Sequence, residues 1–95
     1  MDERGAPPRV LLVAPPPIGE NIMQTSYAQV FGETAAAVTR GLAAEYARYA
    51  RLMRCDFLDA GQYATASRED AIHMTAEGHA RLAEALCARV RAMNL

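Results

Sequence analysis

Asp70 and His73 are the side chains whose types and spacing point most directly to chemistry. They stand three residues apart, just before a stretch that predicts a helix, and a tight turn of that length brings a carboxylate against one imidazole nitrogen. The other nitrogen is then free to take a proton from a nucleophile, while the acid orients the ring and stabilises the imidazolium. Taken alone, the four residues favour a capped turn, in which Asp70 accepts backbone amides and His73 is a polar surface residue.

Two short apolar runs predict strands, and a long periodic stretch between them predicts a helix. Residues 10–14 read VLLVA between prolines, which is typical of a strand buried in a parallel sheet. Residues 18–29 are predicted to be a loop, and apolar residues recurring every three or four positions predict one helix over residues 30–53. Gly41 inside that helix predicts a close packing contact. Residues 55–61, CDFLDAG, predict the second strand, parallel to the first in a right-handed strand-helix-strand unit.

A C-terminal helix is predicted to begin after Thr75, a favourable N-cap. Its apolar stripe is expected to include His79 as a histidine packed on the core. The stripe consists of His79, Leu82, Ala83, Leu86, Val90 and Met93. The loop before this helix, residues 61–74, carries Asp70 and His73 and follows the second strand. In open α/β sheets, functional groups gather on loops at the carboxyl ends of the strands, which is where this loop is expected.

The predicted α/β order of strand, helix, strand, helix leaves the sheet too small. A sheet of two parallel strands has too few neighbours to bury both faces of VLLVA. We therefore expect either strands from a partner chain or a larger α/β domain, and we interpret residues 1–95 as a single incomplete domain.

Composition and charge exclude several classes of protein. The chain of 95 residues is 52% hydrophobic and 22% charged, which is ordinary for a globular domain. Its formal charge of -1, with no basic stripe, argues against nucleic acid as a partner. Residues 1–8, MDERGAPP, lack the features of a signal peptide, and no apolar run approaches the about 20 residues of a membrane span. We expect no membrane association and a cytoplasmic location.

Four blocks of the sequence resemble the C-terminal part of the SGNH (GDSL-type) hydrolases, in the arylesterase and acyltransferase branch. They are VLLVAPPPIG at 10–19, LAAEYARYA at 42–50, CDFLDAG at 55–61 and DAIHMTAEGHARLAEAL at 70–86. The resemblance implies a partial flavodoxin-like three-layer fold, with Asp70 and His73 as the acid and base of a catalytic triad. It also implies a small carboxylic ester as substrate, hydrolysed or used for acyl transfer, and no cofactor. Ala71 stands where the family usually has glycine, which strains the turn if that position needs a positive φ.

The nucleophile and the oxyanion hole of that family have no counterpart in these residues. Ser26 and Ser67, the only serines, lie in neither a G-D-S block nor a G-x-S-x-G elbow, and we interpret both as loop residues. Asn21 comes nearest to the family's G-x-N-D block but reads G-E-N-I. Without an oxyanion hole the largest catalytic contribution is missing, so the chain alone is expected to be inactive or nearly so.

Two hypotheses follow for the role of the chain. The first is the Asp/His-bearing part of a serine esterase, whose partner is a complementing N-terminal half or a second copy of the chain. The second is a non-catalytic α/β interaction module that assembles through its sheet edge. A metal site built from Asp70, His73 and His79 is disfavoured because no further ligands accompany them.

Overall fold

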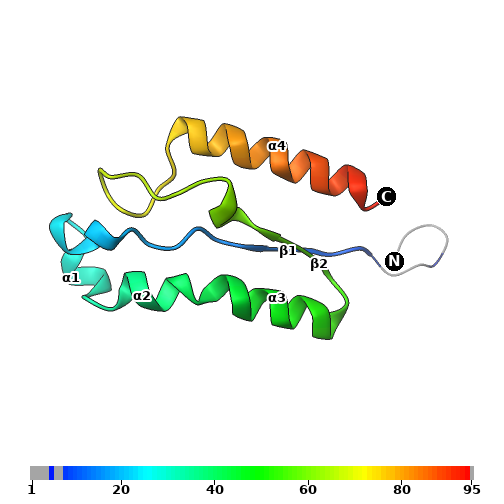
Figure 1. Ribbon diagram of the computed structural model, residues 1–95, viewed down its shortest axis with the longest axis horizontal. Coiled ribbons are helices and arrows are strands. Elements are labelled where there is room, and N and C mark those ends of the chain that lie inside the picture. The colour runs from blue at the N-terminus through cyan, green and yellow to red at the C-terminus, as the bar shows by residue number, and fades with distance from the viewer. Residues whose placement is uncertain (1–4, 6–7, 95) are drawn as a thin grey trace.

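The computed structural model describes residue 5 and residues 8–94. In chain order the elements are β1 (Leu11–Ala14), η1 (Glu20–Gln24), α1 (Ala28–Phe31), α2 (Ala35–Arg40), α3 (Leu42–Met53), β2 (Asp56–Asp59), η2 (Ala60–Gln62) and α4 (Ala76–Ala92). Figure 1 shows three layers, with α4 on one face of the strands and α1 to α3 on the other. The predicted α/β class and the order of strand, helix, strand, helix are confirmed.

The two strands form a parallel pair. Leu11 lies opposite Asp56 and Ala14 lies opposite Asp59. β1 ends where Pro15 has no N–H to donate to a ladder. Of the four apolar residues of β1 only Ala14 is buried, and the other three are half-buried. Within the described part of the chain β2 is the one strand neighbour of β1, so the sheet covers this apolar strand incompletely.

The crossover between the strands is broken into three helices, so the prediction of one helix over residues 30–53 is wrong. Gly32, with φ 75°, ends α1, and the chain turns again at Gly41 between α2 and α3. The predicted close contact at Gly41 is also wrong, because a Cβ there would meet the Val38 carbonyl oxygen at an ordinary 3.5 Å. The predicted loop over residues 18–29 contains η1 and the first residues of α1. The apolar periodicity continues across Gly32 and Gly41, but the helix does not.

α4 is fixed at both ends. The Thr75 hydroxyl accepts a hydrogen bond from the Gly78 amide at 3.0 Å, which confirms the predicted N-cap. At the other end, Arg9 donates to the Met93 carbonyl at 2.8 Å and to Asp56 at 2.7 Å, and Arg89 approaches the same carboxylate at 3.3 Å. These contacts hold the end of α4 at the start of β2. Its beginning therefore lies toward the carboxyl ends of the strands, at the left of Figure 1.

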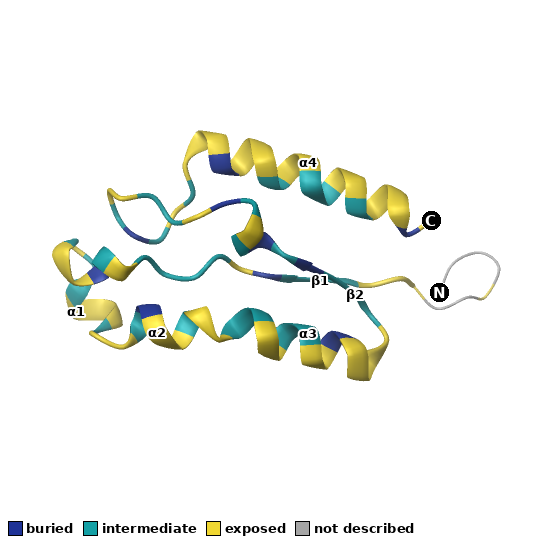
Figure 2. Cartoon of the chain, in the orientation of Figure 1, coloured by how far each residue is buried: buried dark blue, intermediate teal, exposed yellow. Residues whose placement is uncertain are grey.

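The core is thin and consists mostly of alanine. Figure 2 shows the buried positions scattered between the layers rather than gathered in one cluster. The buried apolar residues are Ala14, Ile22, Ala36, Ala50, Leu58, Ala60, Ala64, Ala71 and Met93. Alanine lets elements approach closely but removes little apolar surface from water, so each burial stabilises the fold weakly. Among the described residues, no helix combines the length and apolar character that crossing a bilayer requires.

Candidate active site

The turn before α4 is closed by its own backbone. The Ser67 amide donates to the His73 carbonyl at 2.7 Å, and the Ala71 amide donates to the Ser67 carbonyl at 2.9 Å. An antiparallel bridge between Ala66 and Met74 closes the base of the loop. We call residues 66–74 the Asp-His turn. These bonds connect residues within eight positions of one another, so short-range contacts close the turn that carries Asp70 and His73.

The Asp70 carboxylate is surrounded by hydrogen-bond donors from this turn. Its Oδ1 accepts from the Ile72 and His73 amides, both at 2.9 Å, and from the Ser67 hydroxyl at 3.1 Å. Its Oδ2 lies 2.5 Å from His73 Nδ1. The Ile72 amide, followed by the His73 side chain and amide, holds the pKa of the Asp70 carboxyl well below its usual range. Asp70 therefore stays ionised and acts as an acceptor for the ring.

The His73 ring is oriented by Asp70 and open to its surroundings. An ionised carboxylate can only accept at Nδ1, so in the neutral imidazole the proton lies on Nδ1 and the lone pair on Nε2. The His73 side chain is 70% exposed, against 26% for Asp70. The arrangement joins a shielded acid to an accessible imidazole, which is what a general base needs in order to meet a nucleophile.

Ala71 forms the inner side of the Asp-His turn in a left-handed conformation. Its φ is 64° and its side chain is fully buried. The predicted condition for strain is therefore met, because a residue with a Cβ occupies a conformation that favours glycine. The Ala71 carbonyl accepts a hydrogen bond from the Gly19 amide at 2.7 Å, and this bond connects the Asp-His turn to the segment that follows β1.

Gly19 allows the two loops to pack against each other. A Cβ built on Gly19 would lie 3.1 Å from Ala71 Cβ and 2.8 Å from Asn21 Oδ1, both too close. The Asn21 side chain in turn donates to the Arg68 carbonyl at 2.9 Å. The segments after β1 and before α4 thus meet at the carboxyl end of the sheet, where the loop was expected.

Within the described residues, no other sequence candidate makes a hydrogen bond to the His73 ring. Ser26 is exposed in the turn before α1, and the hydrogen bond that the Ser67 hydroxyl makes goes to Asp70. Asn21 supports the Asp-His turn through the Arg68 carbonyl. His79 is exposed, so the prediction that it packs on the core is wrong. Among the described residues, no three His, Cys, Asp or Glu side chains gather as a metal site would require.

Sequence reasoning missed two residues that support the site. Ser67 was interpreted only as a loop residue, although its position three residues before Asp70 could have suggested a hydroxyl donor to that carboxylate. In the sequence Gly19 is only the end of an apolar block, and its contact with Ala71 joins residues 52 positions apart. No local pattern in the sequence signals a contact of that kind.

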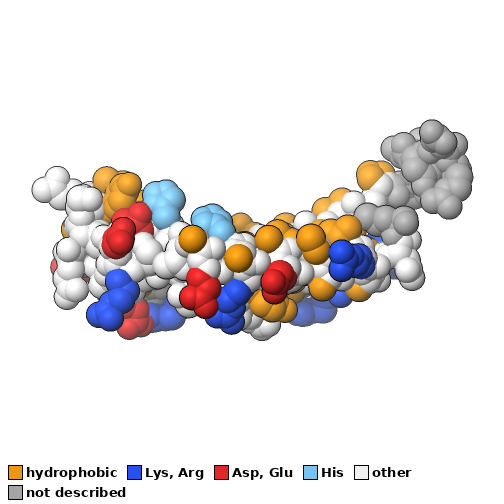
Figure 3. Space-filling model, turned by 90° about the horizontal axis from the view of Figure 1, so that it is seen from above, with side chains coloured by type: hydrophobic (Ala, Val, Ile, Leu, Met, Phe, Trp, Pro, Cys, Tyr) orange, Lys and Arg blue, Asp and Glu red, His pale blue; other side chains and the backbone are white. Residues whose placement is uncertain are grey.

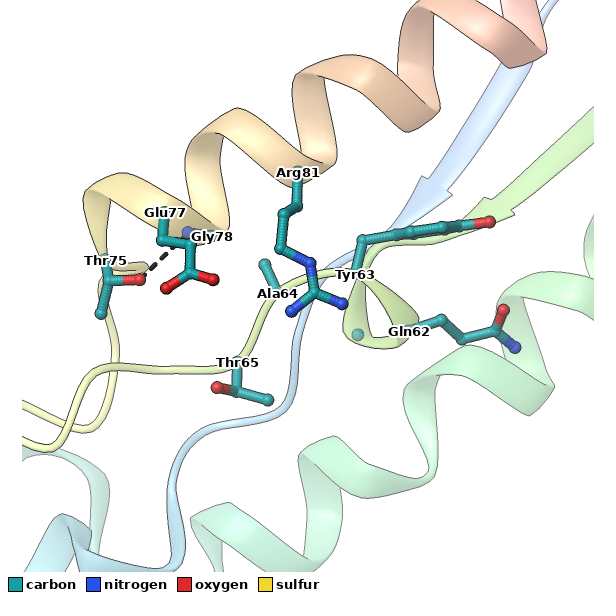
Figure 4. Close-up of a pocket in the computed structure, with 9 residues that line it drawn as sticks. Gln62, Tyr63, Ala64, Thr65, Thr75, Glu77, Gly78 and Arg81 are labelled. Carbon is teal, nitrogen blue, oxygen red and sulfur yellow. Dashed lines mark hydrogen bonds between the residues drawn. The ribbon is translucent and has the colours of Figure 1, made fainter.

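A pocket of about 240 Å³ opens beside the start of α4, but its lining includes neither Asp70 nor His73. Figure 4 shows Glu77 and Arg81 extending from α4 toward the loop that carries Ala64 and Thr65. Thr75, two residues after His73, forms one wall. The pocket is therefore a neighbour of the Asp-His turn, and Asp70 and His73 lie outside it.

Comparison with known proteins gives structural relatives only. No protein-family model and no curated protein matches the chain. A carbohydrate acetylesterase family member from Sinorhizobium meliloti is 29% identical with a TM-score of 0.84, over 97% of this chain and 42% of that one. The native aryl esterase of M. smegmatis is 34% identical with a TM-score of 0.79, over 90% of this chain and 39% of that one.

The chain thus spans about two fifths of the length of the solved esterases that it matches. The matching region includes nearly all the elements described above, and the fold class predicted from the sequence is confirmed. The chain has the partial, flavodoxin-like SGNH hydrolase fold of these esterases, as its resemblance to the C-terminal part of that family implied.

Proposed function

We propose that this chain supplies the acid and base of a serine esterase, and that the nucleophile and the oxyanion-hole donors come from outside these 95 residues. The observation that carries the proposal is the 2.5 Å contact between Asp70 Oδ2 and His73 Nδ1, on a ring whose other nitrogen is accessible. The likeness to an acetylesterase and an aryl esterase favours small carboxylic esters as substrates.

In the proposed reaction His73 moves one proton in each direction. As a serine hydroxyl attacks the ester carbonyl, Nε2 takes the hydroxyl proton, and Asp70 stabilises the resulting imidazolium through Nδ1. The imidazolium then gives that proton to the leaving alcohol, which leaves an acyl-serine. Water attacks the acyl-serine while Nε2 takes a proton from the water, and the imidazolium then gives that proton to the serine oxygen as the carboxylic acid is released. If an alcohol replaces water in the second step, the product is a new ester.

The direct test is hydrolysis of p-nitrophenyl acetate by the 95-residue chain, alone and together with the part of the M. smegmatis aryl esterase that it does not match. We expect negligible turnover alone and clear turnover in the mixture, abolished by His73→Ala. Robust turnover by the chain alone, lost in His73→Ala, would show that the nucleophile lies within these residues and would overturn the proposal.

The second candidate is a non-catalytic interaction module, which the exposed apolar side chains beside β1 favour. The two candidates differ in what His73 does. In the esterase, His73→Ala removes hydrolysis and leaves assembly intact. If assembly with a partner occurs and no ester is hydrolysed under any condition tested, the module is the better description.

A further inference from the structure

One edge of β1 offers backbone groups to a further parallel strand. The register with β2, in which the Asp56 amide donates to the Val10 carbonyl at 2.9 Å, directs the polar groups of Leu12 and Ala14 toward β2. The N–H and C=O groups of Leu11 and Val13 therefore point to the other edge. In residues 8–94 no strand pairs with them, and an open apolar edge of this kind invites a strand from elsewhere.

The helical crossover carries an apolar flank on the same side. Val38, Tyr49 and Met53 lie on one flank of α2 and α3 and are 65%, 51% and 72% exposed. The opposite flank carries Ala44 and Arg51, both exposed as well. In a right-handed crossover from β1 through α3 to β2, the apolar flank faces the side of the sheet where β1 is the edge strand. The other flank faces the side where β2 is the edge strand.

α4 also exposes apolar side chains, on the opposite face of the sheet, and grooves of about 320 Å³ lie along both of its flanks. Its exposed residues His79, Ala83 and Val90 form one flank, and a groove of about 320 Å³ lies along that flank between Leu86 and Val90. α4 runs antiparallel to the strands and lies on the face opposite α3, so this flank of α4 also lies on the β1 side. Figure 3, seen from the α4 side, shows the histidines and much of the apolar surface toward one long side, with acidic and arginine side chains along the other.

We propose that the β1 side of the molecule, defined by the free edge of Leu11 and Val13 and by these two apolar flanks, docks the part of an esterase-type domain that the chain does not span. One parallel strand pairs with β1, and helices on either side of that strand cover Met53 and Val90. The occupant follows from the length that the chain does not span: the match covers 97% of this chain but 42% of the acetylesterase. This inference rests on the proposed function, because it places the source of the missing nucleophile.

The test co-expresses the affinity-tagged chain with the part of the M. smegmatis aryl esterase that it does not match, and measures co-purification and amide hydrogen exchange. We expect the Leu11 and Val13 amides to become protected in the complex. Val13→Pro removes a donor from the free edge while the β1–β2 ladder keeps its bonds, and Met53→Arg places a charge on the apolar flank. Each is expected to weaken the complex by about tenfold or more. Ala44→Arg, the matched charge on the opposite flank, is expected to leave it unchanged.

Four results would overturn the docking surface. The first is that the two proteins do not co-purify, and the second is that a complex forms but the Leu11 and Val13 amides stay unprotected. The third is that Ala44→Arg weakens the complex as much as Met53→Arg does. The fourth is that the chain forms a dimer that Val13→Pro dissociates, while the esterase segment does not bind. Because Met53 is mostly exposed, Met53→Arg still tests the surface if Val13→Pro fails to fold. A complex with the expected variant pattern that hydrolyses no p-nitrophenyl acetate would leave the docking surface standing and overturn the proposed function.

Discussion

The Asp-His turn and the β1 side of the sheet differ in how completely the described chain satisfies them. In the turn, residues within eight positions of each other supply every bond that holds Asp70. On the β1 side, the backbone groups of Leu11 and Val13 have no strand partner within the described residues. Apolar side chains of α3 and α4 on that side are exposed. The difference teaches that bonds between near neighbours in the sequence are enough to pair Asp70 with His73, whereas the open edge of β1 needs a strand that the described residues do not supply.

The largest expected effect is on catalysis, from Asp70→Asn in the chain assembled with the esterase segment. An amide in place of the carboxylate can present N–H to His73 Nδ1 and so favours the wrong tautomer, which leaves Nε2 without its lone pair. We expect kcat to fall by about 10³- to 10⁴-fold, with co-purification unchanged, because Asp70→Asn alters neither the β1 edge nor the two apolar flanks. Ser67→Ala, which removes one donor to Asp70, should cost far less. Equal loss of assembly and activity in Asp70→Asn would mean that the turn and the β1 side are not separate.

The next largest effect is expected from Gly19→Ala, which tests the contact that ties the turn to the segment after β1. The new methyl would lie 2.8 Å from Asn21 Oδ1 and 3.1 Å from Ala71 Cβ, so the Asn21 side chain has to shift and Ala71 has to give by a few tenths of an ångström. We expect the free energy of unfolding to fall by about 1–3 kcal/mol in urea titration. The matched variant is Gly41→Ala, where the methyl meets the Val38 carbonyl oxygen at 3.5 Å. It should gain up to about 1 kcal/mol from helix propensity. A loss of similar size in both variants would refute this account of Gly19.

Ala71→Gly is expected to have a smaller effect, in the opposite direction. Glycine relieves the cost of a left-handed conformation at φ 64°, about 1–2 kcal/mol for a residue with a Cβ, and loses part of that gain to the greater freedom of the unfolded chain. We expect a net gain of about 0.5–1 kcal/mol in the free energy of unfolding. Ala83→Gly in α4, an exposed helical position, should instead lose about 1 kcal/mol. If Ala71→Gly also destabilised the chain, the buried methyl would outweigh the strain.

The sequence predicted what short-range patterns determine. Two parallel strands, the Thr75 cap and the pairing of Asp70 with His73 all depend on residue type and local spacing. The resemblance to a family added the fold class, and with it the expectation that Ala71 occupies a position suited to glycine.

What the sequence did not predict depends on distant contacts. The apolar pattern of α4 predicts one buried face, yet Leu82 is half-buried and Met93 buried, whereas His79 and Val90 are exposed. An apolar residue that packs on the core and an apolar residue that is exposed on a helix flank recur with the same helical spacing in the sequence. Likewise, periodicity alone did not reveal that the crossover breaks at Gly32 and Gly41, because the apolar positions remain in phase across both.

The smallest expected effect is a pH dependence of stability that comes from the Asp-His turn alone. Folding lowers the pKa of the Asp70 carboxyl, chiefly through the Ile72 amide, from an unfolded value of about 3.9. Ionised Asp70 therefore stabilises the fold fully above that value, and the contribution is lost as the pH falls below about 4 toward the lower folded pKa. The stability difference between the unaltered chain and Asp70→Asn, measured by urea unfolding, should shrink between pH 5 and pH 2.5. Glu69→Gln is the matched control, since this neighbouring carboxylate is exposed, and its difference should change little. A constant stability difference for Asp70→Asn across this range would show that the donors around Asp70 hold the turn in place without favouring the ionised form of its carboxyl group.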